Sequence, residues 1–257
     1  SAVEVAVGLR LDGFSALMML LVSGIGLLVV VYSMGYFRHP HEHTVRLMGL
    51  LTLFGGSMAG LVLADNLLVL YGFWELTSIT SFFLIGNRHD DIAARAAALQ
   101  ALLITGLGGL AMFAGFVILG QEAGTYRLSA ILADPPGGAT VTAALVLILA
   151  GAFTKSAQYP FHGWLPGAMV APTPVSTYLH SATMVKAGVY LVARLAPAFF
   201  SVGMWRPVIV TVGLVTMIAG GLRALRQHDL KLLLAMGTVS QLGFMMVILG
   251  WGTRDAV

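Results

Sequence analysis

The sequence of 257 residues contains no cysteine and few charged residues. The absence of cysteine excludes disulfides, thiolate nucleophiles and thiolate metal sites within these residues. Charged residues make up 10% of the chain and hydrophobic residues 58%, with a mean hydropathy of +0.90. This composition is far from that of a soluble domain, and it predicts an integral membrane protein.

The net charge is also small. It is +3 at pH 7 and comes from scattered arginines, with no basic cluster of the kind that binds nucleic acid. We therefore exclude nucleic acid as a partner and expect the lipid bilayer to surround the chain. The sequence begins without methionine and shows no signal-peptide pattern, so we expect a piece of a longer protein.

Long apolar runs define the predicted architecture. Their lengths suit helices of about 20 residues that cross a bilayer, and they do not alternate as barrel strands would. We predict an all-α, polytopic membrane helix bundle of about eight transmembrane helices forming one domain, 1–257. The runs cover residues 14–37, 46–64, 66–86, 97–120, 140–157, 174–195, 206–225 and 229–251.

The connections between the runs differ in positive charge. Those after the first, third and seventh runs hold seven basic residues, and the other side holds five, which favours the first set as cytoplasmic. The first set is Arg38, Arg46, Arg88, Arg95, Arg223, Arg226 and Lys231, and the second is Arg10, Arg127, Arg194, Arg206 and Arg254.

A proline-rich stretch interrupts the fifth run. The sequence "GAFTKSAQYPFHGWLPGAMVAPTPVS" places Pro160 and Pro166 directly after an apolar segment. Proline removes a backbone hydrogen bond and clashes with the preceding turn, so we expect one helix to break near residues 158–160. Broken helices within a membrane are tolerated where they line a cavity, and in transporters they often mark the ion site.

Lysine is scarce, and its placement is unusual. Two of the three lysines, Lys155 and Lys186, lie within apolar segments, while most arginines lie in loops or at the ends of runs. A desolvated lysine can release its proton near neutral pH, whereas arginine stays protonated. Glu75 lies near the middle of the third run. Each such charge costs at least ~2.5 to 3.5 kcal/mol to insert, so each needs a partner or water.

Two histidines complete the set of candidate site residues, which is Glu75, Lys155, His162, His180 and Lys186. A structural interpretation stays open for each of them. Glu75 could form an ion pair that only joins helices, and both histidines could be hydrogen-bonded core residues. Nearby hydroxyls, among them Ser156 and Thr183, could bond their own helices or line a chain of water molecules.

Other site types are not favoured. The stretch "HPHEH" (His39 to His43) could bind a transition metal, but it lacks a second ligand cluster, so we predict no metal site. The glycines of "TGLGGLAMFAG" lack the strand and turn of a phosphate loop and are assigned to helix packing. We expect no cofactor and no catalytic residues.

Three segments resemble a known family. The 42 residues "FTKSAQYPFHGWLPGAMVAPTPVSTYLHSATMVKAGVYLVAR", together with "LADNLLVLYGFWELTS" and "QHDLKLLLAMGTVSQLGFM", are similar to the antiporter-like subunits of Mrp-type sodium/proton antiporters and of the membrane arm of respiratory complex I. The sequences "WELTSITSFFLIG" and "HSATMVKAG" look most like those of the large A-type Mrp subunit. Gly237 stands where the family commonly has serine.

The resemblance implies a fold of inverted five-helix repeats, each with a broken helix. The first repeat would cover residues 44–195, and residues 196–257 would begin the second. Glu75 matches the ion-paired glutamate of the family, and Lys155 matches the lysine on the broken helix. His180 and Lys186 match relay positions on the next helix. His162 is a further candidate for the relay.

These observations predict a subunit of a multisubunit cation/proton antiporter in the cell membrane, specifically a bacterial inner membrane. Its partners would be other hydrophobic antiporter subunits, protons and Na⁺ or Li⁺, and it would be a secondary transporter rather than an enzyme. An ionised Glu75 ~4 Å from Lys155 would hold the lysine's proton by about 4 kcal/mol at an effective dielectric of ~20. Separation of the pair would release that proton toward His180 and Lys186. The alternatives are a proton-pumping subunit of an NADH:quinone oxidoreductase or membrane-bound hydrogenase, and a structural scaffold.

Overall fold

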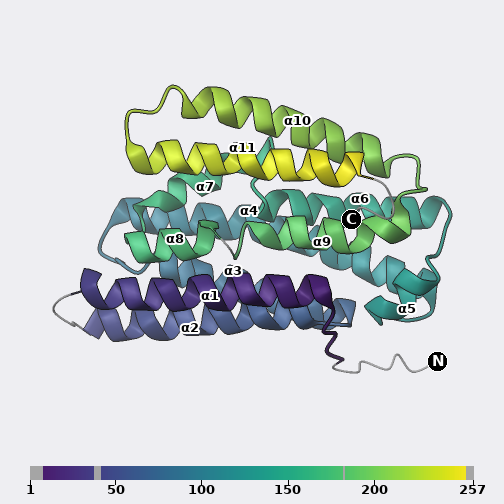
Figure 1. Cartoon of the computed structure of the whole chain (residues 1–257), viewed down its shortest axis with the longest axis horizontal. Helices are drawn as coiled ribbons and strands as arrows, with labels where there is room; N and C mark the ends of the chain where they lie inside the picture. Colours follow the sequence, from purple (N-terminus) through teal and green to yellow (C-terminus); the bar gives the residue numbers. More distant parts are fainter. Residues whose placement is uncertain (1–7, 38–41, 182, 253–257) are drawn as a thin grey trace.

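The computed structural model describes residues 8–37, 42–181 and 183–252. These residues form a bundle of helices that run nearly parallel to one long axis (Figure 1). The helices are α1 (Gly13–Tyr36), α2 (Glu42–Leu63), α3 (Leu67–Ile85), α4 (Ile92–Ala123), α5 (Leu128–Ala133), α6 (Ala139–Lys155), α7 (Trp164–Gly167), α8 (Thr173–Ser181), α9 (Lys186–Phe199), α10 (Trp205–Ala224) and α11 (Leu230–Trp251), with short 3₁₀ turns η1 (Phe161–Gly163) and η2 (Ala168–Val170).

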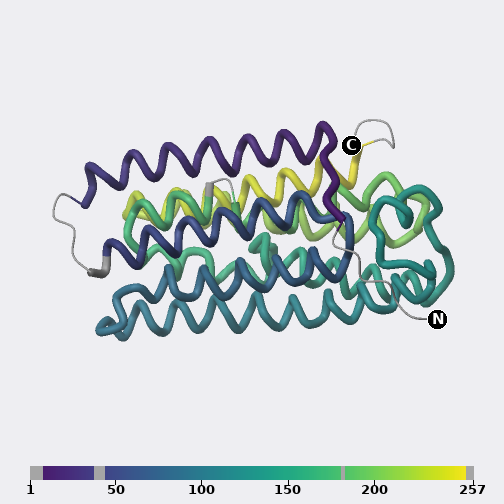
Figure 2. The backbone as a smooth tube through the Cα atoms, turned by 90° about the horizontal axis from the view of Figure 1, so that it is seen from below, coloured from purple at the N-terminus to yellow at the C-terminus, as the bar shows by residue number. Residues whose placement is uncertain are grey.

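Six of the predicted runs are unbroken helices long and apolar enough to cross a membrane. They are α1, α2, α3, α4, α10 and α11. The prediction of an all-α membrane bundle is therefore confirmed, and the chain is a multi-pass membrane protein. Viewed from below, α1 and α4 lie on opposite flanks of the bundle (Figure 2).

The two remaining runs are broken helices. The expected break follows α6, which ends at Lys155, three residues before the predicted position. The run over 174–195 was predicted as one continuous helix, and this is wrong, because it is divided into α8 and α9 between Ser181 and Lys186. No proline lies in that gap. Side chains from elsewhere satisfy the backbone there, as described below.

Small residues bring α4 and α6 into direct backbone contact. A Cβ added to Gly151 would lie 2.7 Å from the carbonyl oxygen of Gly108, and one added to Gly115 would lie 2.6 Å from that of Ala144. Larger side chains would force the two helices apart. The predicted packing role of the small residues in "GLGGLAMFAG" is thus confirmed, and it places α6 against α4 along its length.

The basic residues separate between the two ends of the bundle as the runs predicted. One end, which we call the basic face, is where α3 and α10 end and where α2, α4 and α11 begin (Figure 1). Among the described residues it carries Arg46, Arg88, Arg95, Arg223, Arg226 and Lys231. Arg10, Arg127, Arg194 and Arg206 lie toward the opposite face. Arg38 and Arg254 lie outside the described residues, and the cytoplasmic orientation stays a prediction.

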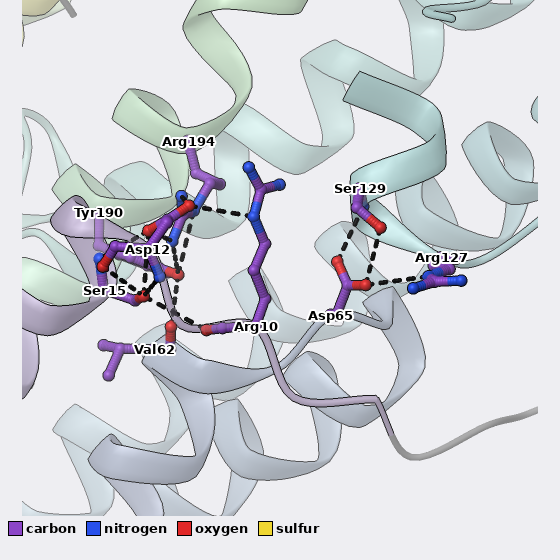
Figure 3. Close-up of polar contacts among 9 residues, drawn as sticks. All are labelled: Arg10, Asp12, Ser15, Val62, Asp65, Arg127, Ser129, Tyr190 and Arg194. Atoms are coloured by element: carbon purple, nitrogen blue, oxygen red, sulfur yellow. Dashed lines mark hydrogen bonds and ion pairs between the residues drawn. The ribbon is translucent and has the colours of Figure 1, made fainter. Parts of the chain in front are cut away.

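Two carboxylates organise the opposite face (Figure 3). Asp12, the N-cap of α1, binds both terminal nitrogens of Arg194 on α9, at 2.6 and 3.1 Å. The hydroxyl of Tyr190 accepts from Arg194 and donates to the carbonyl of Val62 at the end of α2, at 2.7 Å. The sequence placed Arg194 only at the end of a run. The structure buries it as the link between α9 and the start of α1.

Asp65 makes the second connection between elements at the opposite face. It lies between α2 and α3 and accepts from the hydroxyl of Ser129 at 2.7 Å and from Arg127 Nε at 3.1 Å, which attaches the short helix α5 (Figure 3). Burial alone would raise the pKa of the Asp65 carboxyl. The hydrogen bonds from Ser129 and Arg127 outweigh that effect, so the pKa is lowered from its usual 3.8.

Asp65→Asn should reduce stability in a pH-dependent way. Because the folded-state pKa is lowered, the carboxylate's contribution is fully present above pH 3.8 and is lost as the pH falls below that value. At pH 7 we expect the variant to lose about 1–3 kcal/mol of unfolding free energy. Thermal unfolding of the purified protein in detergent, measured from pH 3 upward, tests this.

Glu122→Gln provides the control, because Glu122 is exposed in the last turn of α4. A difference between wild type and Asp65→Asn that is as large at the acid end as at pH 7 would contradict the assigned role of the carboxylate.

Candidate functional site

The break after α6 is stabilised by bonds to its freed backbone groups. The indole nitrogen of Trp164 donates to the carbonyl of Thr154 at 2.9 Å, and the backbone N–H of Gln158 donates to the carbonyl of Phe153 at 2.9 Å. The Tyr159 amide donates to the hydroxyl of Thr216 on α10, also at 2.9 Å. Backbone groups that lose helical partners inside a membrane must be satisfied in this way. Trp164 therefore closes the end of α6 directly beside Lys155.

Lys155 is fully buried at this helix end, with 0% of its surface exposed. Its ammonium donates to the carbonyl oxygen of Trp74 at 2.6 Å and to the hydroxyl of Ser78 at 2.9 Å, both on α3. The nitrogen also lies over the Trp74 ring, 4.6 Å from its centroid, in a cation-π arrangement. The ammonium is therefore held by neutral groups. Since Trp74 and Ser78 lie near the middle of α3, Lys155 lies at mid-depth in the bundle.

Glu75 lies between the two residues that hold Lys155, but it makes no close ion pair with it. Among the described residues, the Glu75 carboxylate and the Lys155 ammonium do not come within 4.0 Å of each other. The Oε1 atom of Glu75 is buried against Gly109 of α4, where an added Cβ would lie 2.1 Å from it. It has no hydrogen-bond partner there. The structure thus holds the carboxylate on the same stretch of α3 as the ammonium, without direct contact.

The second break lies against the first. The hydroxyl of Ser156, the residue after Lys155, donates to the carbonyl of Val185 at 2.7 Å and accepts from the amide of Val189 at 3.1 Å. Ser156 therefore caps the start of α9 from a different helix. At the end of α8, Thr183 donates to the carbonyl of Tyr178. These bonds explain why 174–195 is not one helix.

Lys186 begins α9 at this junction and is half-buried. The next turn permits the close approach of the two broken helices, because a Cβ on Gly188 would lie 2.2 Å from the Ala152 carbonyl oxygen and 2.4 Å from Ser156 Oγ. The Ser156 hydroxyl thus connects the chain segment that follows Lys155 to the segment around Lys186.

The two histidines occupy separate places. His180 on α8 is 7% exposed, and its ring lies 6.2 Å from that of Trp164. Within the described part of the chain, neither of its ring nitrogens has a hydrogen-bond partner. His162 on η1 stacks on Tyr159, with centroids 5.6 Å apart, and its Nε2 contacts Arg223 at the end of α10. Trp164 thus lies between the end of α6 and His180, whereas His162 faces α10.

Several residues of the site were not singled out from the sequence. Trp74, Ser78, Trp164 and Gly188 all contact the lysines or the breaks directly. Ser78 could have been noticed, because hydroxyl residues recur in "WELTSITS" within an otherwise apolar run. The histidines of "HPHEH" lie outside the residues whose side chains are described. Elsewhere in the described part of the chain, no three metal-ligating side chains come together.

Comparison with known proteins identifies the family. A family model described as "NADH:quinone oxidoreductase/Mrp antiporter, TM" matches residues 64–257, and one described as "NADH-Ubiquinone oxidoreductase (complex I), chain 5 N-terminus" matches residues 1–46. The chain belongs to the NADH:quinone oxidoreductase/Mrp antiporter transmembrane family.

Curated relatives include the A-type subunit of a Na⁺/H⁺ antiporter from Alkalihalophilus pseudofirmus, 48% identical over 94% of this chain and 30% of its own length. The combined A/B-type subunit of a probable K⁺/H⁺ antiporter from Rhizobium meliloti is 49% identical over 95% of this chain and 25% of its own length. The chain thus spans about a quarter to a third of these relatives. The predicted similarity to the A-type Mrp protein is confirmed.

Solved structures show the same fold. A chain of the Mrp complex from Dietzia sp. DQ12-45-1b superposes with a TM-score of 0.89 at 43% identity, over 95% of this chain and 27% of that one. A chain of an archaeal membrane-bound sulfane sulfur reductase has a TM-score of 0.88 at 24% identity, over 98% of this chain and 52% of that one. The second likeness concerns the fold alone.

Gly188→Ala should destabilise the junction of the two breaks. The added methyl group would overlap a backbone carbonyl, which cannot rotate away, so we expect a loss of about 1–3 kcal/mol. Gly106→Ala on α4 is the matched control, because nothing lies within 4 Å of its added Cβ. Thermal unfolding in detergent measures both. Equal stability of the two variants would contradict the close approach.

Proposed function

We propose that this chain carries a proton-translocating part of a multisubunit cation/proton antiporter, moving protons through Glu75, Lys155, His180 and Lys186, with His162 on a side branch. The observation that carries the proposal is the bonding of Lys155. A fully buried ammonium at the broken end of a membrane helix is held by a carbonyl and a hydroxyl, and no carboxylate of the described residues lies within 4.0 Å of it. Such an amine can lose its proton without breaking a direct ion pair.

The bonding suits both protonation states of Lys155. A charged ammonium donates to Trp74 and Ser78, as observed. A neutral amine can still donate to the Trp74 carbonyl, and it can accept from Ser78, whose hydroxyl is both donor and acceptor. Loss of the proton therefore keeps both hydrogen bonds of the lysine nitrogen. It gives up the cation-π contact with Trp74 and the bond from the Ser78 hydroxyl to the Trp74 carbonyl. Retention of both hydrogen bonds is what a residue that is repeatedly protonated and deprotonated requires.

Glu75 would act as the electrostatic control of this step. It lies on α3 between the two groups that bind Lys155, and its buried Oε1 lacks a hydrogen-bond partner. Movement of the carboxylate toward Lys155 would favour the charged ammonium, and movement away would favour release. The proton would pass through ordered water along the two breaks to Lys186 and to His180 beside Trp164.

The complete antiporter is larger than the part that these residues form. We infer that residues 44–195 form the first antiporter-like repeat, that 196–257 begin the second, and that other hydrophobic subunits complete the complex. The names of the relatives support Na⁺ or K⁺ as the exchanged cation, with Li⁺ as a sodium substitute. Identities of 43–49% to antiporter proteins, against 24% to a redox complex, favour antiport over redox-driven pumping.

Lys155→Ala and Lys155→Arg should both abolish exchange, by about 100-fold or more, since alanine has no proton to transfer and arginine does not release one. The assay uses everted vesicles that contain the full-length protein and its partner subunits, in cells lacking other antiporters. Respiration establishes the proton gradient, and a ΔpH-sensitive dye follows its collapse on addition of Na⁺, Li⁺ or K⁺.

Arg226→Ala is the control, because Arg226 is an exposed cation in the turn before α11. Exchange that survives in assembled Lys155→Ala complexes would reject the relay. If the assembled wild-type complex responds to none of the three cations, redox-driven pumping becomes the better explanation.

Glu75→Gln should assemble normally, because the amide has the shape of the carboxylate against Gly109, but it should lower exchange by about tenfold or more through loss of the charge. Glu75→Asp keeps the charge on a side chain that is one methylene shorter, and it should retain part of the activity. The same vesicle assay measures both. Equal activity of Glu75→Gln and wild type would show that the carboxylate has no electrostatic role.

A further inference from the structure

Two adjoining cavities lie near the basic face of the bundle. The outer cavity, of about 360 Å³, is bordered by Phe37, Arg88, Pro172, Thr173 and Lys231, among others. The inner cavity, of about 230 Å³, lies between α8 and α11, and its polar lining consists of Thr173, Ser176, Thr177, His180, Lys231 and Thr238. Thr173 and Lys231 line both cavities. These two residues therefore lie where the cavities adjoin.

The inner cavity is suited to hold water. It ends at His180, which is buried and has two ring nitrogens without hydrogen-bond partners. Its volume exceeds the ~30 Å³ that one water molecule occupies, and hydroxyls from both helices face it. The imidazole is buried and has no hydrogen-bond partner among the described residues, and the cavity beside it is lined partly by hydroxyls, so water there can complete its hydrogen bonds.

Lys231 separates the two cavities by a specific pair of bonds. Its ammonium donates to the carbonyl oxygens of Met169 and Ala171, each at 2.6 Å. These carbonyls belong to the end of η2, the last turn of the broken helix before α8 begins. The side chain thus extends from the first turn of α11 across to the segment that leads into α8.

A second cation holds the same segment. Arg88, from the connection between α3 and α4, donates to the carbonyl of Val170 at 3.1 Å. Three consecutive carbonyls, at residues 169, 170 and 171, therefore accept from cationic side chains of two different elements. Carbonyls at the end of a helical turn attract cations, but each bond here is to a neutral acceptor and can be exchanged for water. Arg88 can keep the segment in place while Lys231 moves.

We propose that Lys231 is a gate that separates His180 from the basic face, and that its release from the carbonyls of residues 169 and 171 joins the two cavities into one water-filled path. The proposal rests on the relay role proposed above for His180. Lys231 is a positioning residue in this scheme, because it controls access of water to the imidazole and is not itself assigned a place in the relay.

The test measures water access to the inner cavity. Ser176 is buried and lines this cavity, and the 257 residues contain no native cysteine, so Ser176→Cys introduces one defined thiol here. In the full-length protein within its complex, a small methanethiosulfonate reagent is applied without any ion gradient. Modification of the peptide that contains residue 176 is followed by mass spectrometry.

We expect the modification rate to rise at least tenfold when Lys231→Met is added, because methionine cannot donate to the two carbonyls. Lys231→Arg should restore a slow rate, since arginine can still donate. Arg226→Met, which removes a cation from the same face in the turn before α11, should leave the rate unchanged. A second thiol at Ala101, buried on α4 away from the cavity, should react equally slowly in every variant, which excludes general loosening.

The gate is rejected if residue 176 reacts equally fast with Lys231 present or replaced, or if Ala101→Cys accelerates in parallel. Lys231→Ala supplies the same comparison where Lys231→Met does not assemble, because alanine likewise cannot donate to the two carbonyls. The rates do not depend on antiport. If the modification rates reject the gate, the effect of Lys155→Ala on exchange still stands. If the wild-type complex shows no cation-driven proton movement, the proposed function is overturned, but the modification rates at residue 176 are unaffected.

Discussion

The structure depends on one constraint, which is that every backbone group inside the membrane needs a hydrogen-bond partner within the protein. Two helices are interrupted at the same depth, and Ser156 serves both interruptions by donating to Val185 and accepting from Val189. Because Ser156 follows Lys155 and Val185 precedes Lys186, satisfying the backbone also places the two lysines. Gly188 makes this possible, since no other residue leaves room for the α6 backbone.

The buried charges are of two kinds, and their bonding separates them. Arg194 is bound by both oxygens of Asp12, with further bonds to Tyr190, which fixes it in place. Lys155 is bound by the neutral groups of Trp74 and Ser78. A bidentate ion pair stabilises one charge state, whereas a carbonyl and a hydroxyl accommodate an amine in either state. The first arrangement suits a joint between helices, and the second suits a group that exchanges protons.

Particular segments at the two ends of the bundle are attached in different ways. At the opposite face, Asp12 and Asp65 attach the start of α1 and the helix α5 through ion pairs and hydroxyls (Figure 3). At the basic face, Lys231 and Arg88 hold the end of the broken helix through main-chain carbonyls alone. Carbonyl bonds are replaced by water at lower cost than an ion pair is separated. The two cavities that Lys231 borders lie beside these exchangeable bonds.

Composition and local patterning were enough to predict six unbroken membrane helices, the break before Pro160, the burial of Lys155 and the partial burial of Lys186. Each of these follows from the local cost of placing proline or charge in an apolar helix. The direct partner of Lys155 was not predictable in the same way. Glu75 was the natural expectation from charge, but the ammonium binds the carbonyl of its neighbour Trp74 and the hydroxyl of Ser78.

The sequence by itself thus determined that the chain forms membrane helices, where proline breaks one of them, and which residues are costly to bury. Only the tertiary structure decided the second break, the Asp12–Arg194 joint and the cavities beside Lys231. The reason is physical, because each of these depends on contacts between distant residues, with Ser156 and Val185 separated by 29 positions and Asp12 and Arg194 by 182. Local pattern carries no information about which distant hydroxyl, carbonyl or carboxylate will meet a given backbone group or charge.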